Sequence, residues 1–185
     1  MATDKTVVDY FQENVTKFGD KRFMTQPMGG GDSNVKYYTF AEIYEEAKKM
    51  AGYIESLGFE PKSQIAICSK NCVWWIIADL GIWMAGHVSV PVYPTLTGDT
   101  TKYILEHSES KLLFVGKLDE HPWAEMKKGV PDSLPTISFP LCPKGNPAQK
   151  TWDDVMKTAT PIKEPVKRSV DEMATIIYTS GSTGQ

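Results

Sequence analysis

The chain has 185 residues, of which 41% are hydrophobic and 23% charged, and its formal net charge is −3 at pH 7. This length suffices for one sizeable α/β core or for one domain with an appendage. The slight negative charge provides no basic surface for a phosphate backbone, which argues against nucleic-acid binding. The cysteines, Cys68, Cys72 and Cys142, lack paired metal-ligand spacing, so we expect reduced thiols in a cytosolic protein.

We expect no membrane-spanning helix in this sequence. Its first residues are polar and carry no apolar signal-peptide core. The longest apolar stretch, residues 73–85, is interrupted by Asp79 and is shorter than the roughly 20 residues that cross a bilayer. We therefore expect a cytoplasmic protein, while contact with a membrane surface and the oligomeric state stay open.

Two helices near the start carry the signature of a capping box, in which a threonine is followed three positions later by an acidic residue. Thr6 with Asp9 would begin a helix over residues 6–18, and Thr39 with Glu42 would begin a longer one that ends near residue 57. Apolar residues recur at helical spacing in both segments. Short strands are predicted between the two helices, at residues 22–26 and 35–38.

The middle of the chain predicts a βαβ unit. Residues 64–68 and 88–92 have the pattern of buried strands, and an apolar helix over residues 72–85, capped by Asn71, separates them. Pro91 lacks an N–H group and indicates that the second strand lies at an edge or ends early. A strand–helix–strand unit of this length implies parallel pairing with a right-handed crossover.

The strand–helix alternation continues toward the end of the chain and predicts a doubly wound sheet. A helix over residues 99–107 should turn Tyr103 and Ile104 inward. Lys163, Lys167 and Arg168 are interpreted as solvated charges of an extended linker. The remaining predicted elements are strands at 112–115, 135–139 and 173–178 and helices at 120–128 and 151–157.

A cluster of hydroxyl residues and glycines follows the predicted final strand. It consists of Thr179, Ser180, Gly181, Ser182, Thr183 and Gly184. Glycines let a ligand approach the backbone, and hydroxyls with exposed N–H groups can donate hydrogen bonds to phosphate oxygens. In open α/β sheets ligands bind beyond the carboxyl ends of strands, so the segment predicts a triphosphate site. An ordinary loop is the alternative, and no Gly-Lys-Ser/Thr of a Walker loop follows.

The order of residues 178–184 resembles the phosphate-loop signature of the adenylate-forming (AMP-binding) superfamily, which includes acyl-CoA synthetases, luciferases and peptide-synthetase adenylation domains. Residues 37–42 and 83–91 resemble two further motifs of that family. Residues 92–97 and 104–115 are most similar to long-chain fatty-acid–CoA ligases. The resemblance covers most of the chain, with its motifs in the family's order.

The resemblance implies an α/β fold with parallel-rich layered sheets flanked by helices. Residues 1–185 would form an incomplete N-terminal part of the large AMP-binding domain, with the small C-terminal domain absent. The implied reaction activates a fatty acid with ATP and Mg²⁺ to an acyl-adenylate, and CoA as co-substrate then forms the thioester. The partners are thus small molecules, and Thr179 to Gly184 would bind the ATP phosphates.

No catalytic residue is expected within residues 1–185, and the metal ligands are unknown. His87, His107 and His121 have no recognisable acid or nucleophile partner and are interpreted as ordinary surface or core histidines. We expect the 185-residue chain alone to be inactive. Two alternatives stay open: an adenylating enzyme for a different carboxylate, and a non-catalytic binding module that retains the fold.

Overall fold

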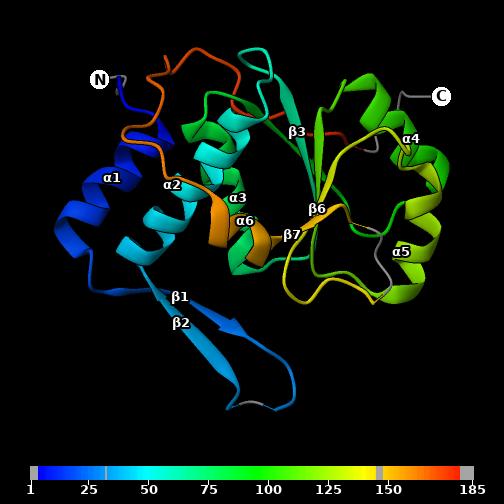
Figure 1. Ribbon diagram of the computed structural model, residues 1–185, viewed down its shortest axis with the longest axis horizontal. Helices are drawn as coiled ribbons and strands as arrows, with labels where there is room; N and C mark the ends of the chain where they lie inside the picture. The colour runs from blue at the N-terminus through cyan, green and yellow to red at the C-terminus, as the bar shows by residue number, and fades with distance from the viewer. Residues whose placement is uncertain (1–3, 32, 145–147, 180–185) are drawn as a thin grey trace.

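The computed structural model describes residues 4–31, 33–144 and 148–179 and shows a parallel sheet between two layers of helices (Figure 1). The sheet has five strands in the order β4-β3-β5-β6-β7, and every neighbouring pair is parallel. The strands are β3 (Gln64–Cys68), β4 (Val88–Val92), β5 (Leu112–Val115), β6 (Thr136–Ser138) and β7 (Lys150–Thr151). The predicted α/β fold with parallel pairing is confirmed.

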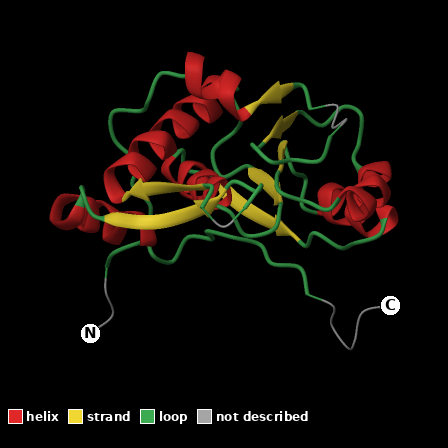
Figure 2. Ribbon diagram, turned by 90° about the horizontal axis from the view of Figure 1, so that it is seen from below, coloured by secondary structure: helices red, strands yellow, loops and turns green. Residues whose placement is uncertain are grey.

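Helices cover both faces of the sheet, as Figure 2 also shows from a perpendicular direction. One face carries α1 (Val7–Phe18), α2 (Phe40–Ser56), α3 (Val73–Met84) and α6 (Trp152–Thr158). The other carries α4 (Gly98–His107) and α5 (Glu120–Met126), which continues into a 3₁₀ turn, Lys127–Gly129. Alternate strand residues face opposite cores: Ile65 and Ile67 pack in the first, and Ala66 and Cys68 in the second. The doubly wound arrangement is thus confirmed.

Three helices begin with capping boxes in which both reciprocal hydrogen bonds form. The pairs are Thr6 with Asp9, Thr39 with Glu42 and Thr151 with Asp154. At the second of these, the Thr39 N–H donates to the Glu42 carboxylate at 2.8 Å, and the Glu42 N–H donates to the Thr39 hydroxyl at 3.2 Å. Both predicted boxes are confirmed, because all their partners lie within one helical turn.

The start of α3 differs from the prediction. Asn71 is exposed, and no side chain of the N-cap residue, Cys72, accepts a hydrogen bond from the helix. Instead the Val73 N–H donates to Oε1 of the buried Gln26 at 2.8 Å. Gln26 lies in β1 (Arg22–Pro27), one arm of an antiparallel hairpin with β2 (Val35–Thr39). The cap comes from a residue 47 positions away, which no local pattern could indicate.

Two smaller differences concern the ends of the sheet and the apolar helix. The two-residue strand β7 was not predicted, because two exposed residues show no alternation of polar and apolar side chains. The apolar helix α3 has 12 residues and is one residue shorter at each end than the predicted range 72–85. None of the helices within residues 4–31, 33–144 and 148–179 is long and apolar enough to cross a membrane.

The Gln26 contact can be tested by stability measurements. We expect Gln26→Ala to lower the free energy of unfolding by about 1–3 kcal/mol, because it leaves a buried helix N–H without an acceptor. Asn71→Ala is the matched control and should change the free energy by less than about 0.5 kcal/mol, since Asn71 is exposed. Chemical denaturation of both variants measures the difference. Equal losses would contradict the assignment of the cap to Gln26.

Candidate functional site

The segment that precedes the hydroxyl-rich cluster lies beside the edge strand β4. The Ser89 N–H donates to the Ala174 carbonyl at 3.0 Å, and the Ile176 N–H donates to the Ser89 carbonyl at 2.9 Å. These bonds form a single parallel bridge between Ser89 and Thr175. The predicted edge position of β4 within the five-stranded sheet is therefore confirmed, and this segment adds one bridge to its outer side.

The prediction of a buried strand over residues 173–178 is wrong. Met173 and Ile177 are about three-fifths exposed, at 60% and 61%. The bridge is not extended into a ladder, and the next donor on β4 in a parallel register would be Pro91, which has no N–H to offer the Ile176 carbonyl. A single bridge along one side leaves the segment extended but half-exposed.

The bridge still determines the direction of the segment. A parallel pairing means that the residues after Thr175 run toward the carboxyl ends of the strands. Thr179 follows and is exposed. Of the six residues predicted to bind phosphate, Thr179 is the only one within the described part of the chain, while Ser180, Gly181, Ser182, Thr183 and Gly184 lie outside it. The position of Thr179 agrees with an edge at which α/β sheets bind ligands.

An open groove of about 700 Å³ lies at this carboxyl edge. Loops that follow β3 and β4 form its walls, together with one side chain each from α3 and from the terminal segment. The lining residues are Ser69, Lys70, Asn71, Trp75, Pro91, Val92, Tyr93, Pro94 and Ile177. Since Ile177 lies two residues before Thr179, the groove and the start of the predicted phosphate site are neighbours.

The usual binding crevice of a doubly wound sheet lies between β3 and β5, where the strand order reverses, but here it is closed. The Ser69 hydroxyl accepts a hydrogen bond from the Lys117 N–H at 2.9 Å, and the Lys70 N–H donates to the Lys117 carbonyl at 2.8 Å. Lys70 also pairs with Asp119 at 2.6 Å. A Cβ atom at Gly116 would lie 2.2 Å from the Ser69 hydroxyl. Space for a ligand therefore remains on the β4 side.

A clamp of ion pairs holds the chain where it approaches β4. Arg168 pairs with Glu172 at 2.7 Å and donates a hydrogen bond to the backbone carbonyl of His87 at 3.3 Å. The side chain of Arg168 is only 13% exposed, so its interpretation as a solvated linker charge is wrong. A hydrogen bond from the Ser169 N–H, followed by the Lys62 and Arg168 cations, lowers the pKa of Glu172 to about 2. The carboxylate therefore stays ionised at neutral pH.

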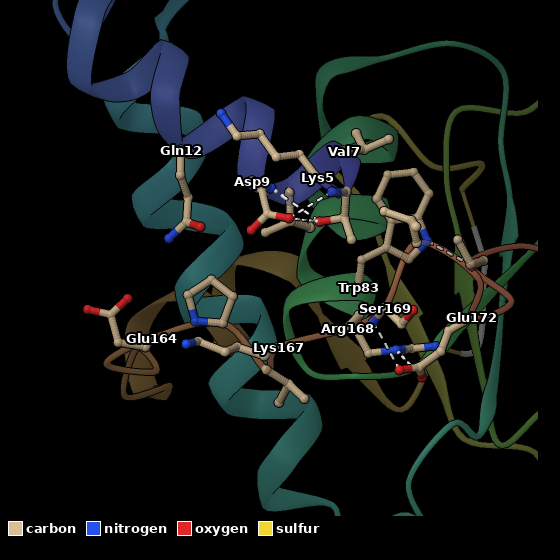
Figure 3. Close-up of a pocket in the computed structure, with 16 residues that line it drawn as sticks. Lys5, Val7, Asp9, Gln12, Trp83, Glu164, Lys167, Arg168, Ser169 and Glu172 are labelled. Carbon is tan, nitrogen blue, oxygen red and sulfur yellow. Dashed lines mark hydrogen bonds and ion pairs between the residues drawn. The ribbon is translucent and has the colours of Figure 1, made fainter. Parts of the chain in front are cut away.

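A second cavity, of about 540 Å³, adjoins this clamp (Figure 3). It lies between the start of α1, Trp83 near the end of α3, and residues 164–174. The Trp83 indole N–H donates to the Ala174 carbonyl at 2.8 Å and so ties the same segment to α3. This cavity is beside the start of β4, at the opposite end of the strand from Thr179.

Buried polar side chains of α3 and of the chain around the start of β4 lie near the Ser89–Thr175 bridge. Asp79 is 7% exposed, and burial raises its pKa to about 6. The nearby Ser89 hydroxyl counteracts part of this pKa shift, but Ser89 Oγ and Asp79 Oδ1 have no hydrogen-bond partner of ordinary geometry among the described residues. Burial also lowers the pKa of His87, with a further contribution from the Arg168 charge. Sequence reasoning noted Asp79 only as an interruption of an apolar stretch.

The remaining histidines and the cysteines occupy distinct environments. His121 is exposed, whereas Nδ1 of His107 lies 2.7 Å from the hydroxyl of Tyr178. The prediction that Tyr103 faces inward is wrong. Its side chain is 57% exposed and stacks on His107 at the surface of α4. Burial raises the pKa of Cys68 to about 12, so its thiol is protonated at neutral pH. The described residues contain no group of three potential metal ligands.

Comparisons with known sequences identify relatives across the chain. A family model described as AMP-binding enzyme matches residues 11–185. A human long-chain-fatty-acid–CoA ligase is 27% identical over 195 residues, which cover 98% of this chain and 28% of that protein. Long chain acyl-CoA synthetase 2 of Arabidopsis thaliana is 29% identical over 190 residues, covering 95% of this chain and 28% of the relative. The chain thus spans little more than a quarter of the length of these relatives.

Solved structures share the fold. A long-chain-fatty-acid–CoA ligase from Archaeoglobus fulgidus superimposes with a TM-score of 0.76 at 22% identity, covering 97% of this chain and 35% of that one. An anthranilate–CoA ligase in complex with anthranoyl-AMP gives a TM-score of 0.78 at 17% identity, covering all of this chain and 34% of that one. At these identities the likeness establishes the arrangement of the backbone.

The burial of Asp79 predicts a pH-dependent cost. Between its ordinary pKa of 3.8 and about 6, the folded protein keeps the proton that the unfolded chain has released. Stability should therefore fall as the pH rises through this window, by about 3 kcal/mol in total. Asp79→Asn cannot ionise, so its stability relative to the wild type should increase from pH 4 to pH 7.

Urea denaturation of the protein at several pH values measures this difference. Asp132→Asn is the control, because Asp132 is exposed and its replacement should change the free energy of unfolding by less than about 0.5 kcal/mol. A difference between Asp79→Asn and the wild type that stays constant from pH 4 to pH 7 would contradict the assignment.

Proposed function

The chain belongs to the AMP-binding enzyme family, and from this premise we propose that it forms the N-terminal part of a ligase that activates a fatty acid with ATP and then transfers the acyl group to CoA. The parallel bridge between Ser89 and Thr175 carries the proposal, since it directs Thr179 to the carboxyl edge of the sheet. The curated relatives at 27% and 29% identity, both named for long-chain acyl substrates, support the fatty-acid class.

The proposed first step forms an acyl-adenylate. A carboxylate oxygen of the fatty acid attacks the α-phosphorus of ATP, the bond from that phosphorus to the bridging oxygen breaks, and pyrophosphate leaves with its electrons. Negative charge grows on the departing pyrophosphate, so donors that already point at it stabilise the transition state. Thr179, Ser182 and Thr183 would supply hydroxyls, and Ser180, Gly181 and Gly184 would add backbone N–H groups and a further hydroxyl.

The proposed second step consumes the adenylate. The sulfur of CoA attacks the acyl carbon and loses its proton, a thioester bond forms, and AMP leaves. Adenylation makes this exchange feasible because AMP is a much better leaving group than a carboxylate oxygen. Mg²⁺ would arrive with ATP, since this ion is usually bound through substrate phosphates and few protein ligands. An exposed threonine beside an open groove suits such an anionic substrate.

Two parts of the proposal need a direct assay: the class of acid and the catalytic activity itself. Solved structures of the same fold are named as benzoate–CoA and anthranilate–CoA ligases, so the fold accommodates acids of different shape. A panel of acids of increasing chain length, assayed with ATP and CoA in the whole protein, separates a fatty-acid ligase from these alternatives. A protein with the fold but no activity toward any acid would be a binding module.

Removal of two donors tests the phosphate site. In the whole protein, Ser182→Ala combined with Thr183→Val should lower the rate of ATP-dependent pyrophosphate release by about 10²–10³, the usual cost of losing well-placed donors. The matched control is Thr25→Val with Ser33→Ala, two exposed hydroxyls on the β1–β2 hairpin, which should leave the rate unchanged. Unaltered pyrophosphate release by the Ser182 and Thr183 variant would refute the assignment.

The extent of the chain yields a further prediction. We expect the 185 residues alone to form no acyl-adenylate under conditions in which the whole protein does, because the chain spans only 28% of its relatives. Radiolabelled palmitate with ATP, followed by chromatography of the acyl-adenylate, provides the measurement. Detectable adenylate from the 185-residue chain would contradict the expectation that this chain is inactive alone.

A further inference from the structure

Tyr178, the residue immediately before Thr179, forms a cluster of three rings with two residues of α4. Tyr103 and His107, one turn apart on α4, stack with ring centroids 5.2 Å apart and planes inclined by 29°. The Tyr178 ring meets both edge-on, at centroid distances of 6.4 Å and 5.7 Å. Its hydroxyl lies 2.7 Å from Nδ1 of His107. Side chains 71 positions apart are thus joined at the surface by packing and by one hydrogen bond.

This cluster is the last described attachment of the chain before the predicted phosphate site. The backbone pairing with β4 ends at Ile176, because Pro91 cannot donate the next hydrogen bond. Ile177 is 61% exposed and Thr179 is also exposed, so neither is held by burial. The Tyr178 ring, by contrast, packs against the core formed by α4 and α5. Its side chain therefore determines where the backbone leaves the sheet.

The hydrogen bond between Tyr178 and His107 can form at any pH near neutrality. Burial raises the pKa of the Tyr178 hydroxyl above its ordinary value of 10, so this group keeps its proton at neutral pH. It can donate to an unprotonated Nδ1 of His107, or accept from Nδ1–H in the other tautomer or in the imidazolium. The contact accordingly persists in every protonation state of the histidine.

The consequence for chemistry follows from distance along the chain. Successive Cα atoms are about 3.8 Å apart, so a shift of Tyr178 also moves Thr179, the first residue of the predicted site. Displacement of a catalytic group by about 1 Å can cost about 10² in rate. A contact that fixes Tyr178 would thus affect catalysis without touching a substrate.

We propose that His107, supported by the stacked Tyr103, is a positioning residue that holds Tyr178 and thereby sets the geometry of the phosphate site that begins at Thr179. The proposal deepens the proposed function and rests on it for its kinetic consequence. Its structural part, the tether itself, can be measured independently of any activity.

The first experiment measures backbone hydrogen exchange in the protein. His107→Ala and Tyr178→Phe should each accelerate exchange in peptides that cover residues 176–185 by about three- to tenfold, the worth of one ordinary hydrogen bond. The double variant should exchange no faster than His107→Ala, because that variant already lacks the hydrogen bond that Tyr178→Phe removes. His107→Gln, which keeps a polar side chain at this position, should restore part of the protection. His121→Ala, another exposed histidine on a helix, is the control and should have no effect.

The second experiment measures pyrophosphate release by the whole protein. Both single variants should lower kcat/KM for ATP by about tenfold, with melting temperatures close to that of the wild type. Unchanged exchange, or additive effects in the double variant, would overturn the tether. Accelerated exchange with unchanged kcat/KM would overturn its role in catalysis. A wild-type protein without adenylation activity would instead refute the proposed function, and the exchange data would still decide the tether.

Discussion

The path of the chain toward Thr179 depends on a backbone pairing only one residue long. Ser89 accepts and donates one hydrogen bond each with the segment around Thr175, and Pro91 then ends the ladder. The short pairing is reinforced from both directions. Before it, the Arg168–Glu172 clamp and the Trp83 indole hold the chain; after it, Tyr178 packs on the α4 side of the sheet. Together with the edge of β4, these side chains determine where the chain leaves the sheet.

The helix α3 connects these anchors to the core. Trp75, Asp79 and Trp83 are spaced four residues apart and so lie along one stripe of the helix. The first lines the groove, the last binds the Ala174 carbonyl, and Asp79 lies between them near Ser89. An ionised carboxylate in this position opposes folding at neutral pH. A helix that is apolar nearly all round can carry this charge because its other faces bury so many apolar side chains.

Sequence reasoning succeeded where the determining contacts are local. Capping boxes, the edge strand with Pro91 and the alternation of strands and helices are all written within a few residues, and they emerged as expected. It failed where the partner is distant. The cap of α3 comes from Gln26, Arg168 is buried by its contacts with β4, and Tyr103 faces a histidine at the surface. The phosphate site was predicted from residue order; the structure describes only Thr179 of its six residues, and the site stays a prediction.

Part of what directs Thr179 to the carboxyl edge is carried by the backbone. The backbone features are the parallel register, Pro91 in β4, and the hydrogen bonds between the loops that follow β3 and β5. They restrict the identity of few side chains. This explains how chains only 17–22% identical to this one share its fold.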